Sequence, residues 1–375
     1  MEEIKHGEQL LQTDTMDLNI GPHHPATHGV LRIVATLDGE RIIKAVPYIG
    51  YLHRGVEKLC EDLTYMQITP HFDRTDYVSN INNELSYVMA VEKLAEIKVP
   101  ERAEFLRVIM LELNRILNHL IWVGSFANDV GLFGTAFMYS FRDRDLIQRV
   151  MERVTGARVH YHYLTYGGVR EEVHDDFEAD VKKLADWIPG RVDEYEMLLE
   201  DNEVFRARTI GVGVLDKEEA INYGCSGPFL RSTGVPIDLR KLEPYSVYPL
   251  FDFDIPVGKN GDAFDRFKVR MNEMRESAKI IKQAIEGLPG GPIRAKVPRK
   301  IRLPKGEVYM RTENTKGEFG VYLVSDGGEK PYRLKLRSPS YVNLMYGSRV
   351  VEGMVLPDVV AVLASVDIVL GCIDR

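Results

Sequence analysis

The hydrophobic period of the chain changes twice along its length, and this restricts the possible folds more than any other feature. Apolar and polar residues alternate in strand-like fashion over residues 16–53 and again after residue 305. Between these regions, apolar residues recur at the i, i+3, i+4 spacing of one helical face. We therefore expect an α+β protein, in which a central helical bundle is flanked by small β-rich N- and C-terminal lobes.

The same patterns divide the chain into five segments. Pro and Gly residues are concentrated between the helical pattern and the second strand pattern, which is typical of a connector. The expected segments are a flexible N-terminus (1–15), an N-terminal β lobe (16–53), a helical bundle (54–287), a connector (288–304) and a C-terminal β-rich lobe with a terminal helix and tail (305–375).

Turn and helix signals predict individual elements. The Asp38-Gly39 pair joins two apolar runs and predicts a β-hairpin. Pro100 suits the first turn of a long helix, which we expect to be interrupted between Gly124 and Gly134. Further helices are expected near residues 144–155, 175–187, 191–201, 265–286 and 357–364, the last leading into a C-terminal strand or tail.

The composition excludes several classes of protein. A hydrophobic content of 45% with 28% charged residues is ordinary for a soluble globular protein, and a net charge of -8 gives no indication of nucleic-acid binding. We expect no transmembrane helix, because no run of 18 apolar residues occurs, and no secretory signal. Three widely spaced cysteines favour a reducing cytosolic compartment over a disulfide framework. If the protein acts at a membrane, other subunits must hold it there.

A histidine-rich segment, GPHHPATHGVLR, spans Gly21–Arg32. His24 and His28 have a spacing that would place both on one face of a helix, as in some metal sites. The prolines and glycine around them make a helix improbable here, so we do not expect a metal. His23 is interpreted as a solvated loop residue.

Several sequence blocks together carry a family resemblance. They include the histidine-rich segment, GYLHRGVEK (Gly50–Lys58) and the terminal SVDIVLGCIDR (Ser365–Arg375). Others are HFDRTDYVSN, LNRILNHL, TGARVHYHY, YGGVR, NYGCSGPFLRSTG, FDFDIPVG, GDAFDRF and KGEFGVYLVSDG. The chain resembles the 49-kDa (D) subunit family of respiratory complex I, which is related to the large subunits of nickel–iron hydrogenases. The resemblance implies a hydrogenase large-subunit-like fold.

The hydrogenase metal ligands are largely missing from this chain. By the resemblance, the two C-x-x-C pairs of hydrogenases would fall at Asp76 and Ser79 and at Val369 and Cys372. A soft metal needs thiolate ligands, and one cysteine cannot supply them. The resemblance thus implies no metal and no cofactor bound by this chain alone, with an iron–sulfur cluster on the partner small subunit. For Cys372 the plainest interpretation is a buried, inert thiol.

The resemblance assigns three residues to the head group of a lipid-soluble electron acceptor. Tyr77 and His28 would donate hydrogen bonds to it, since a phenol and an imidazole can also deliver protons. Asp129 would pair with His28, and an anionic partner favours a protonated imidazole. The alternatives are a packed tyrosine with a satisfied hydroxyl and an aspartate that caps a helix.

The resemblance places Arg54, His160 and, less firmly, Arg74 near the cluster of the partner subunit. A cation there stabilises the reduced cluster, and a titrating histidine couples its potential to pH. The alternatives are an ordinary surface ion pair for Arg54 and a packed polar residue for His160.

The implied function is that of a peripheral-arm subunit in a complex I-like oxidoreductase, at the cytoplasmic face of the membrane. Its partners would be the cluster-bearing small subunit, other peripheral-arm subunits and membrane-arm subunits. The acceptor would be a quinone or methanophenazine, and the whole complex would translocate ions. Two branches of the family fit, one with NADH and one with reduced deazaflavin (factor 420) as electron donor. The histidine-rich segment, Cys372 and the chain length slightly favour the deazaflavin branch. A hydrogenase large subunit and a non-catalytic scaffold are the competing hypotheses.

Overall fold

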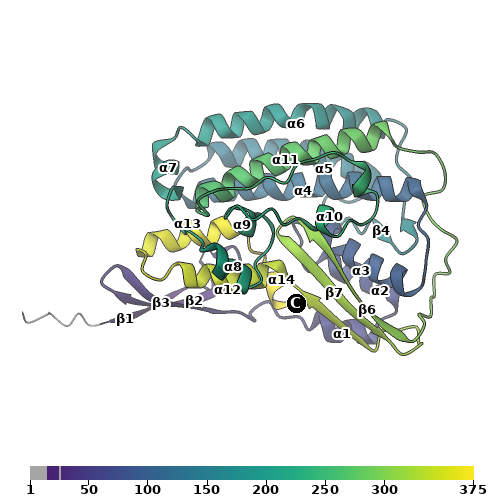
Figure 1. The fold of residues 1–375 in the computed structure, drawn as a ribbon, viewed down its shortest axis with the longest axis horizontal. Helices are drawn as coiled ribbons and strands as arrows, with labels where there is room; N and C mark the ends of the chain where they lie inside the picture. Colours follow the sequence, from purple (N-terminus) through teal and green to yellow (C-terminus); the bar gives the residue numbers. More distant parts are fainter. Residues whose placement is uncertain (1–14, 25–26) are drawn as a thin grey trace, which may run out of the picture.

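The computed structural model describes residues 15–24 and 27–375, and the fold is α+β. The segment expected to be a flexible N-terminus therefore lies, except for its last residue, outside the described residues. Figure 1 shows long helices stacked along one side of the molecule and two small sheets on the other. The central bundle and the small sheets predicted from the hydrophobic period are thus both present.

The N-terminal sheet is antiparallel, in the order β1 (Met16–Ile20), β2 (Arg32–Asp38) and β3 (Arg41–Tyr48). The hairpin predicted at Asp38-Gly39 joins β2 to β3, whereas β1 was not predicted. Alternate residues of β2, including Ile33, Ala35 and Leu37, are buried. They share a hydrophobic cluster with α12 (Pro339–Val350) and α13 (Leu356–Val366), so this sheet packs against the C-terminal part of the chain.

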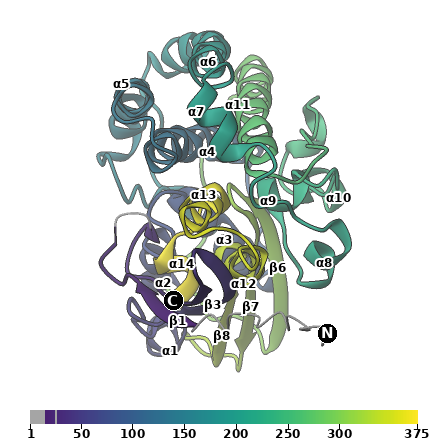
Figure 2. The same ribbon diagram turned by 90° about the vertical axis from the view of Figure 1, so that its left-hand side faces the viewer.

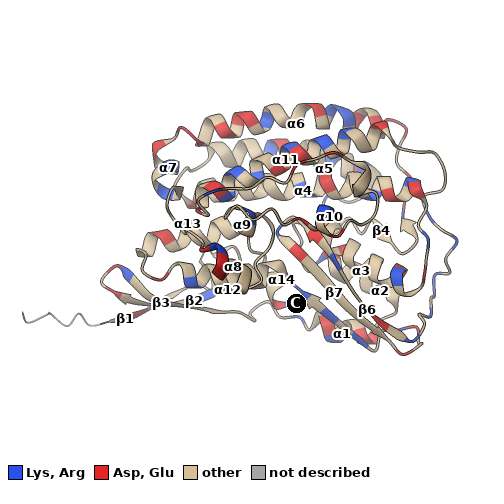
Figure 3. Ribbon diagram, in the orientation of Figure 1, with Lys and Arg blue, Asp and Glu red and all other residues tan. Residues whose placement is uncertain are grey.

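Four long helices form the bundle, namely α4 (Glu101–Asp129), α5 (Thr135–Thr155), α6 (Phe177–Leu199) and α11 (Ala263–Glu286). Viewed nearly end-on in Figure 2, they lie side by side above the rest of the molecule. Most residues of α4 are buried, because other helices and the C-terminal elements cover it on several sides. In Figure 3, acidic and basic residues are interspersed along α6 and α11.

The helix predicted to start at Pro100 begins at Glu101, but the predicted interruption from Gly124 was wrong. α4 continues through Gly124 to Asp129, and only residues 130–134 break it. A Cβ at Gly124 would lie 2.3 Å from Ser140 Oγ and 3.2 Å from Phe137 Cα. Gly124 therefore permits the close approach of α5 to α4, at a small cost in helix propensity.

Two further predictions of elements were wrong. The helices expected near 175–187 and 191–201 are one helix, α6, which contains Pro189. Burial of Ile188 and Val192 on either side of the proline outweighs the lost backbone hydrogen bond. The expected C-terminal strand or tail is a short helix, α14 (Leu370–Asp374), whose residues are all buried.

The C-terminal sheet is also antiparallel, in the order β6 (Gly306–Asn314), β7 (Gly317–Ser325) and β8 (Arg333–Arg337). Its buried residues, such as Phe319 and Val321, join the hydrophobic core that includes α2 (Tyr65–Asp73) and α3 (Asn80–Leu94). Residues 288–304 reach this sheet from α11 without a helix or a named strand.

Shorter elements complete the described chain. They are α1 (Val56–Asp62), β4 (Leu164–Thr165), β5 (Gly168–Val169), α7 (Glu203–Thr209), α8 (Lys217–Asn222), α9 (Gly227–Arg231), α10 (Leu239–Leu242) and the 3₁₀ helix η2 (Tyr248–Leu250). Across residues 15–24 and 27–375, none of the helices has the length and apolar character needed to cross a bilayer.

Candidate functional site

His28 and Asp129 form a close side-chain pair. His28 lies in the loop before β2, and Asp129 is the last residue of α4. Their Nε2 and Oδ2 atoms are 2.6 Å apart, and both side chains are more than four-fifths buried. Asp129 was expected in the break between helices but ends α4, and it does not cap α5, whose N-cap residue is Gly134.

The pair opens onto a cavity of about 420 Å³. Its other lining residues are Ser125, Asn128, Phe133 and Phe137. Apolar rings with a few convergent polar groups are typical of a small-molecule site. The exposed fraction of the Phe133 side chain is 84%, so this chain alone does not enclose the cavity on that side.

Tyr77 lies in the loop that joins α2 to α3, and its side chain is 40% exposed. Burial raises the pKa of its hydroxyl, and the carboxylate of Asp76 raises it further, while Lys316 and Arg54 oppose this. A phenol in these surroundings stays protonated at neutral pH and can donate a hydrogen bond. Tyr77 is not among the residues that line the His28 cavity.

Two consecutive residues of α14 lie against the loops that carry His28 and Tyr77. A Cβ at Gly29 would be 3.4 Å from Leu370 Cδ1, and a Cβ at Gly371 would be 2.8 Å from the carbonyl oxygen of Thr75. The structure therefore brings both loops to the same short helix. It does not bring the two side chains into contact.

The terminal motif also fixes the loop that precedes α1. The carboxylate of Asp374 accepts hydrogen bonds from the backbone N–H groups of Gly50 (2.8 Å) and Leu52 (2.7 Å). Arg54 follows this loop, and its Nη2 donates to the carbonyl oxygen of Arg74 at 2.7 Å. The charges of Arg74 and Arg54 add to burial in lowering the pKa of His71. Arg54 and Arg74, which the resemblance paired functionally, are thus neighbours.

His160 lies in the loop between α5 and β4, with a left-handed backbone (φ 58°). Its Nδ1 is buried and has no hydrogen-bond partner. Two residues further on, the backbone N–H of His162 donates to Asp73 Oδ2 at 2.9 Å. This bond attaches the His160 loop to the residue that precedes Arg74.

The four residues that the resemblance aligned with hydrogenase metal ligands make other interactions in the structure. Asp76 forms a buried ion pair with Lys316 at 3.0 Å. Ser79 Oγ donates to Asn314 at 2.8 Å, and Val369 belongs to the hydrophobic core. Cys372 lies 2.9 Å from Ser338 Oγ, and burial raises the pKa of its thiol to about 12. A thiol that stays protonated is a poor metal ligand.

Sequence reasoning missed Lys316, although it starts one of the blocks that carry the resemblance. Lys316 is fully buried, and it also lies 3.9 Å from Asp367 and contacts Asn118. Further buried ionisable groups continue into the bundle, where His119 Nε2 lies 2.9 Å from Glu273 Oε2. A lysine at the start of a strand pattern is usually read as solvated, and only the fold shows that its charge is compensated internally.

Comparison with known protein families decides the identity of the chain. A model of the family described as "Respiratory-chain NADH dehydrogenase, 49 Kd subunit" matches residues 129–301 and 296–375. The chain belongs to this 49-kDa subunit family. The family implied by the sequence blocks is therefore confirmed.

Three relatives of the 49-kDa subunit family are similar over nearly their whole length. A protein of Desulforamulus reducens is 50% identical over 97% of this chain and 99% of the relative. Proteins of Geobacter metallireducens (48%, over 98% of this chain and 100% of the relative) and Dehalococcoides mccartyi (49%, over 97% and 100%) are similar as well. All three are named as the same subunit of NADH-quinone oxidoreductase. The chain is thus a complex I-type subunit of a multisubunit oxidoreductase.

Proposed function

We propose that this 49-kDa subunit forms, together with a cluster-bearing small subunit, the pocket in which a quinone is reduced. The observation that carries the proposal is the His28–Asp129 pair at the edge of a cavity of about 420 Å³. A charged or chargeable pair beside apolar rings suits a ligand with an apolar ring and polar oxygens. Reduction of the quinone would be coupled to ion translocation by the whole complex.

Reduction of one quinone to the hydroquinone requires two electrons and two protons. An iron–sulfur cluster on the partner small subunit would supply the electrons. One head-group oxygen takes a proton from the Tyr77 hydroxyl, and the other takes a proton from the imidazole of His28. Asp129 orients the ring and offsets its positive charge while it is protonated. Both donors are then reprotonated from water.

Arg54, Arg74 and His160 would face the partner's cluster. Arg54 is a fixed cation held beside Arg74 by the hydrogen bond to its backbone. His160 has a buried ring nitrogen, Nδ1, without a hydrogen-bond partner in the chain. The guanidinium would stabilise the reduced cluster, and the imidazole would take up a proton with the electron.

The exposed apolar residues near the cavity support a pocket shared with other subunits. Phe133 is 84% exposed and Met138 is 69% exposed, both close in sequence to the Asp129 end of α4. Large apolar side chains beside a site mark contacts with a partner or an apolar ligand. We infer that membrane-arm and small subunits cover this face and hold the chain at the cytoplasmic side of the membrane.

The donor and the acceptor ring are part of the same proposal. The names of the relatives favour NADH and quinone, and reduced deazaflavin with methanophenazine is the alternative. Membranes that contain the complex should oxidise one donor and not the other. Oxidation of reduced deazaflavin without NADH oxidation would reject the first assignment.

Replacement of His28 tests the pocket itself. In the assembled complex, His28→Ala should lower quinone reduction by about 10²–10⁴-fold, while donor oxidation with a soluble artificial acceptor persists. His23→Ala is the matched control, because His23 is an exposed histidine of the same loop. Equal quinone reduction in the two variants would support the scaffold hypothesis, whereas hydrogen oxidation would support a hydrogenase.

A further inference from the structure

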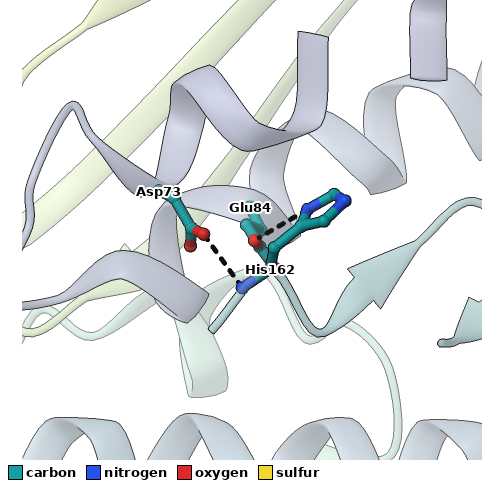
Figure 4. Close-up of side chains that lie close together, drawn as sticks. All are labelled: Asp73, Glu84 and His162. Carbon is teal, nitrogen blue, oxygen red and sulfur yellow. Dashed lines mark hydrogen bonds and ion pairs between the residues drawn. The ribbon is translucent and has the colours of Figure 1, made fainter. Parts of the chain in front are cut away.

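Three side chains from separate segments converge beside the Tyr77 loop. Asp73 ends α2, Glu84 lies in α3, and His162 lies in the loop before β4. One ligand-type atom of each residue lies within 4.8 Å of the corresponding atoms of the other two. Figure 4 shows the imidazole of His162 facing the Glu84 carboxylate, while the dashed line from Asp73 ends on the backbone nitrogen of His162.

The backbone holds one oxygen of each carboxylate. The N–H of His162 donates to Asp73 Oδ2, and the N–H of Leu164 donates to Glu84 Oε2, each at 2.9 Å. These bonds fix the orientation of both groups. The other oxygens, Asp73 Oδ1 and Glu84 Oε1, are buried without a hydrogen-bond partner, and so is Nδ1 of His162.

The contact between the imidazole and the Glu84 carboxylate is long. His162 Nδ1 lies 3.5 Å from Glu84 Oε1, beyond the range of a good hydrogen bond. Both carboxylates are completely buried, whereas the exposed fraction of the His162 side chain is 24%. Buried polar atoms are normally paired. Here the two carboxyl groups can pair by sharing a proton, and a cation bound by the same three residues would replace that proton.

In departure from the expectation that this chain alone binds no metal, we propose that Asp73, Glu84 and His162 bind one divalent transition-metal ion, with Zn²⁺ as the best fit. One imidazole and two carboxylates suit a borderline ion better than Ca²⁺ or Mg²⁺, which prefer oxygen ligands alone. Two ionised carboxylates and a neutral imidazole would neutralise the ion inside the protein. A tetrahedral Zn²⁺ needs ligand atoms about 3.4 Å apart, so small side-chain rotations would close the site.

The electrostatics of the cluster agree with a cationic ligand. Burial, followed by the charge of Glu84, raises the pKa of Asp73 to about 9, and burial raises the pKa of Glu84 to about 7. Two buried carboxyls this close resist ionising together. A shared proton offsets part of this repulsion, and a divalent ion would offset more of it.

An entry route exists on the His162 side. His162 lines a cavity of about 310 Å³ together with Met66, Thr69 and Thr165. Arg170, Arg294 and Arg299 line the same cavity with one acidic residue, Glu171, so entry of a cation meets a net positive charge. We expect uptake to be slow at low ionic strength and faster as salt screens the rim.

The metal would act as a clamp between the loops of the candidate site. Asp73 precedes Arg74 and is four residues from Tyr77, and His162 is two residues from His160. A metal ion bound by Asp73 and His162 would fix the distance between the Tyr77 loop, proposed to face the acceptor, and the His160 loop, proposed to face the cluster. This role is structural, and it is independent of which acceptor the complex reduces.

The test uses the full-length chain, stripped with a chelator and incubated with Zn²⁺ before desalting. Elemental analysis should find one Zn²⁺ per chain, and titration calorimetry should give the affinity. Loss of a group that only orients a metal ligand lowers metal affinity by about 10–100-fold. Because His162 is proposed as a direct ligand, His162→Ala should weaken Zn²⁺ binding by at least about tenfold. Co²⁺ should give a visible absorption band with the native chain and lose it in this variant.

Controls separate the cluster from other histidines. His23→Ala should bind Zn²⁺ as the native chain does, and Glu84→Gln should behave like His162→Ala. Zn²⁺ should raise the melting temperature of the native chain and not that of His162→Ala. If Glu84→Gln does not fold, His162→Ala still tests the proposal, because His162 is partly exposed and its replacement disturbs the core less. Retention of Zn²⁺ by His162→Ala, loss of it in His23→Ala, or no uptake by the native chain would each overturn the proposal.

Discussion

His28 and Asp129 are 101 residues apart in the sequence, and their side chains meet at 2.6 Å. The contact joins the loop before β2 to the end of α4, so the position of the imidazole depends on the helical bundle. A histidine in a loop is normally mobile. Here its ring is fixed by an anion at the end of a helix that is buried along most of its length.

Asp129→Asn should affect quinone reduction less than His28→Ala does. The amide keeps the shape of the carboxylate but no longer offsets a protonated imidazole. We expect a loss smaller than about 10²-fold. Steady-state quinone reduction by membranes, measured at several pH values, checks this. A loss as large as that of His28→Ala at every pH would contradict a supporting role.

Tyr77→Phe removes one hydroxyl and keeps the ring. We expect quinone reduction to fall by about 10²–10⁴-fold, while assembly and reduction of a soluble artificial acceptor continue. Tyr332→Phe is the control, because Tyr332 is an exposed tyrosine of another region. Unchanged quinone turnover in Tyr77→Phe would reject its proposed role.

His160→Met should uncouple the partner's cluster from pH. The thioether has similar bulk but no site for a proton, so the midpoint potential should lose most of its pH dependence. Replacing Arg54 should lower the potential without changing its slope against pH, since the guanidinium stays charged. Redox titration of the assembled complex, followed by electron paramagnetic resonance, measures both. An unaltered slope in His160→Met would leave this histidine a structural role only.

Lys316→Met should destabilise the chain by about 3–5 kcal/mol, because it leaves the buried carboxylate of Asp76 unpaired. The Lys316→Met/Asp76→Asn double variant should recover part of this loss. Lys330→Met, at an exposed lysine, serves as the control. Denaturant unfolding measures all three, and purely additive effects in the double variant would show that the pair is not coupled.

The cysteines should be unreactive in the folded chain. Burial raises the thiol pKa of Cys60, Cys225 and Cys372 to about 12 in each case. At pH 8 the thiolate fraction is then about 10⁻⁴, and it grows about tenfold per pH unit. A thiol reagent at pH 8 should label no cysteine quickly in the native chain and three after unfolding. Rapid labelling of Cys372 in the native chain would contradict its burial.

Local patterns predicted the local parts of the fold. The Asp38-Gly39 turn and the start of α4 after Pro100 depend on neighbouring residues, and both were predicted. Gly124 and Pro189 were misread as breaks, because the packing that accommodates them involves distant segments. A glycine at a helix crossing and a glycine at a helix end look the same in one sequence.

The residues of the candidate site were likewise predicted only in part. The resemblance supplied Tyr77, His28 and Asp129, and the structure shows one contact among them. Lys316 and the Asp73–Glu84–His162 cluster were missed, because each joins residues from segments far apart in the chain. No spacing rule within one segment can reveal such a set. A buried charge becomes visible only when its compensating partner is known.

The position of α14 has a consequence for how the protein is made. Leu370 and Gly371 support the loops of His28 and Tyr77, and Asp374 holds the loop before Arg54. These supports follow the loops by about 300 residues along the chain. During synthesis the early loops must wait for residues 370–374 before they reach their final geometry. A ribosome-bound chain that lacks those residues would thus contain every proposed donor and still have no organised pocket.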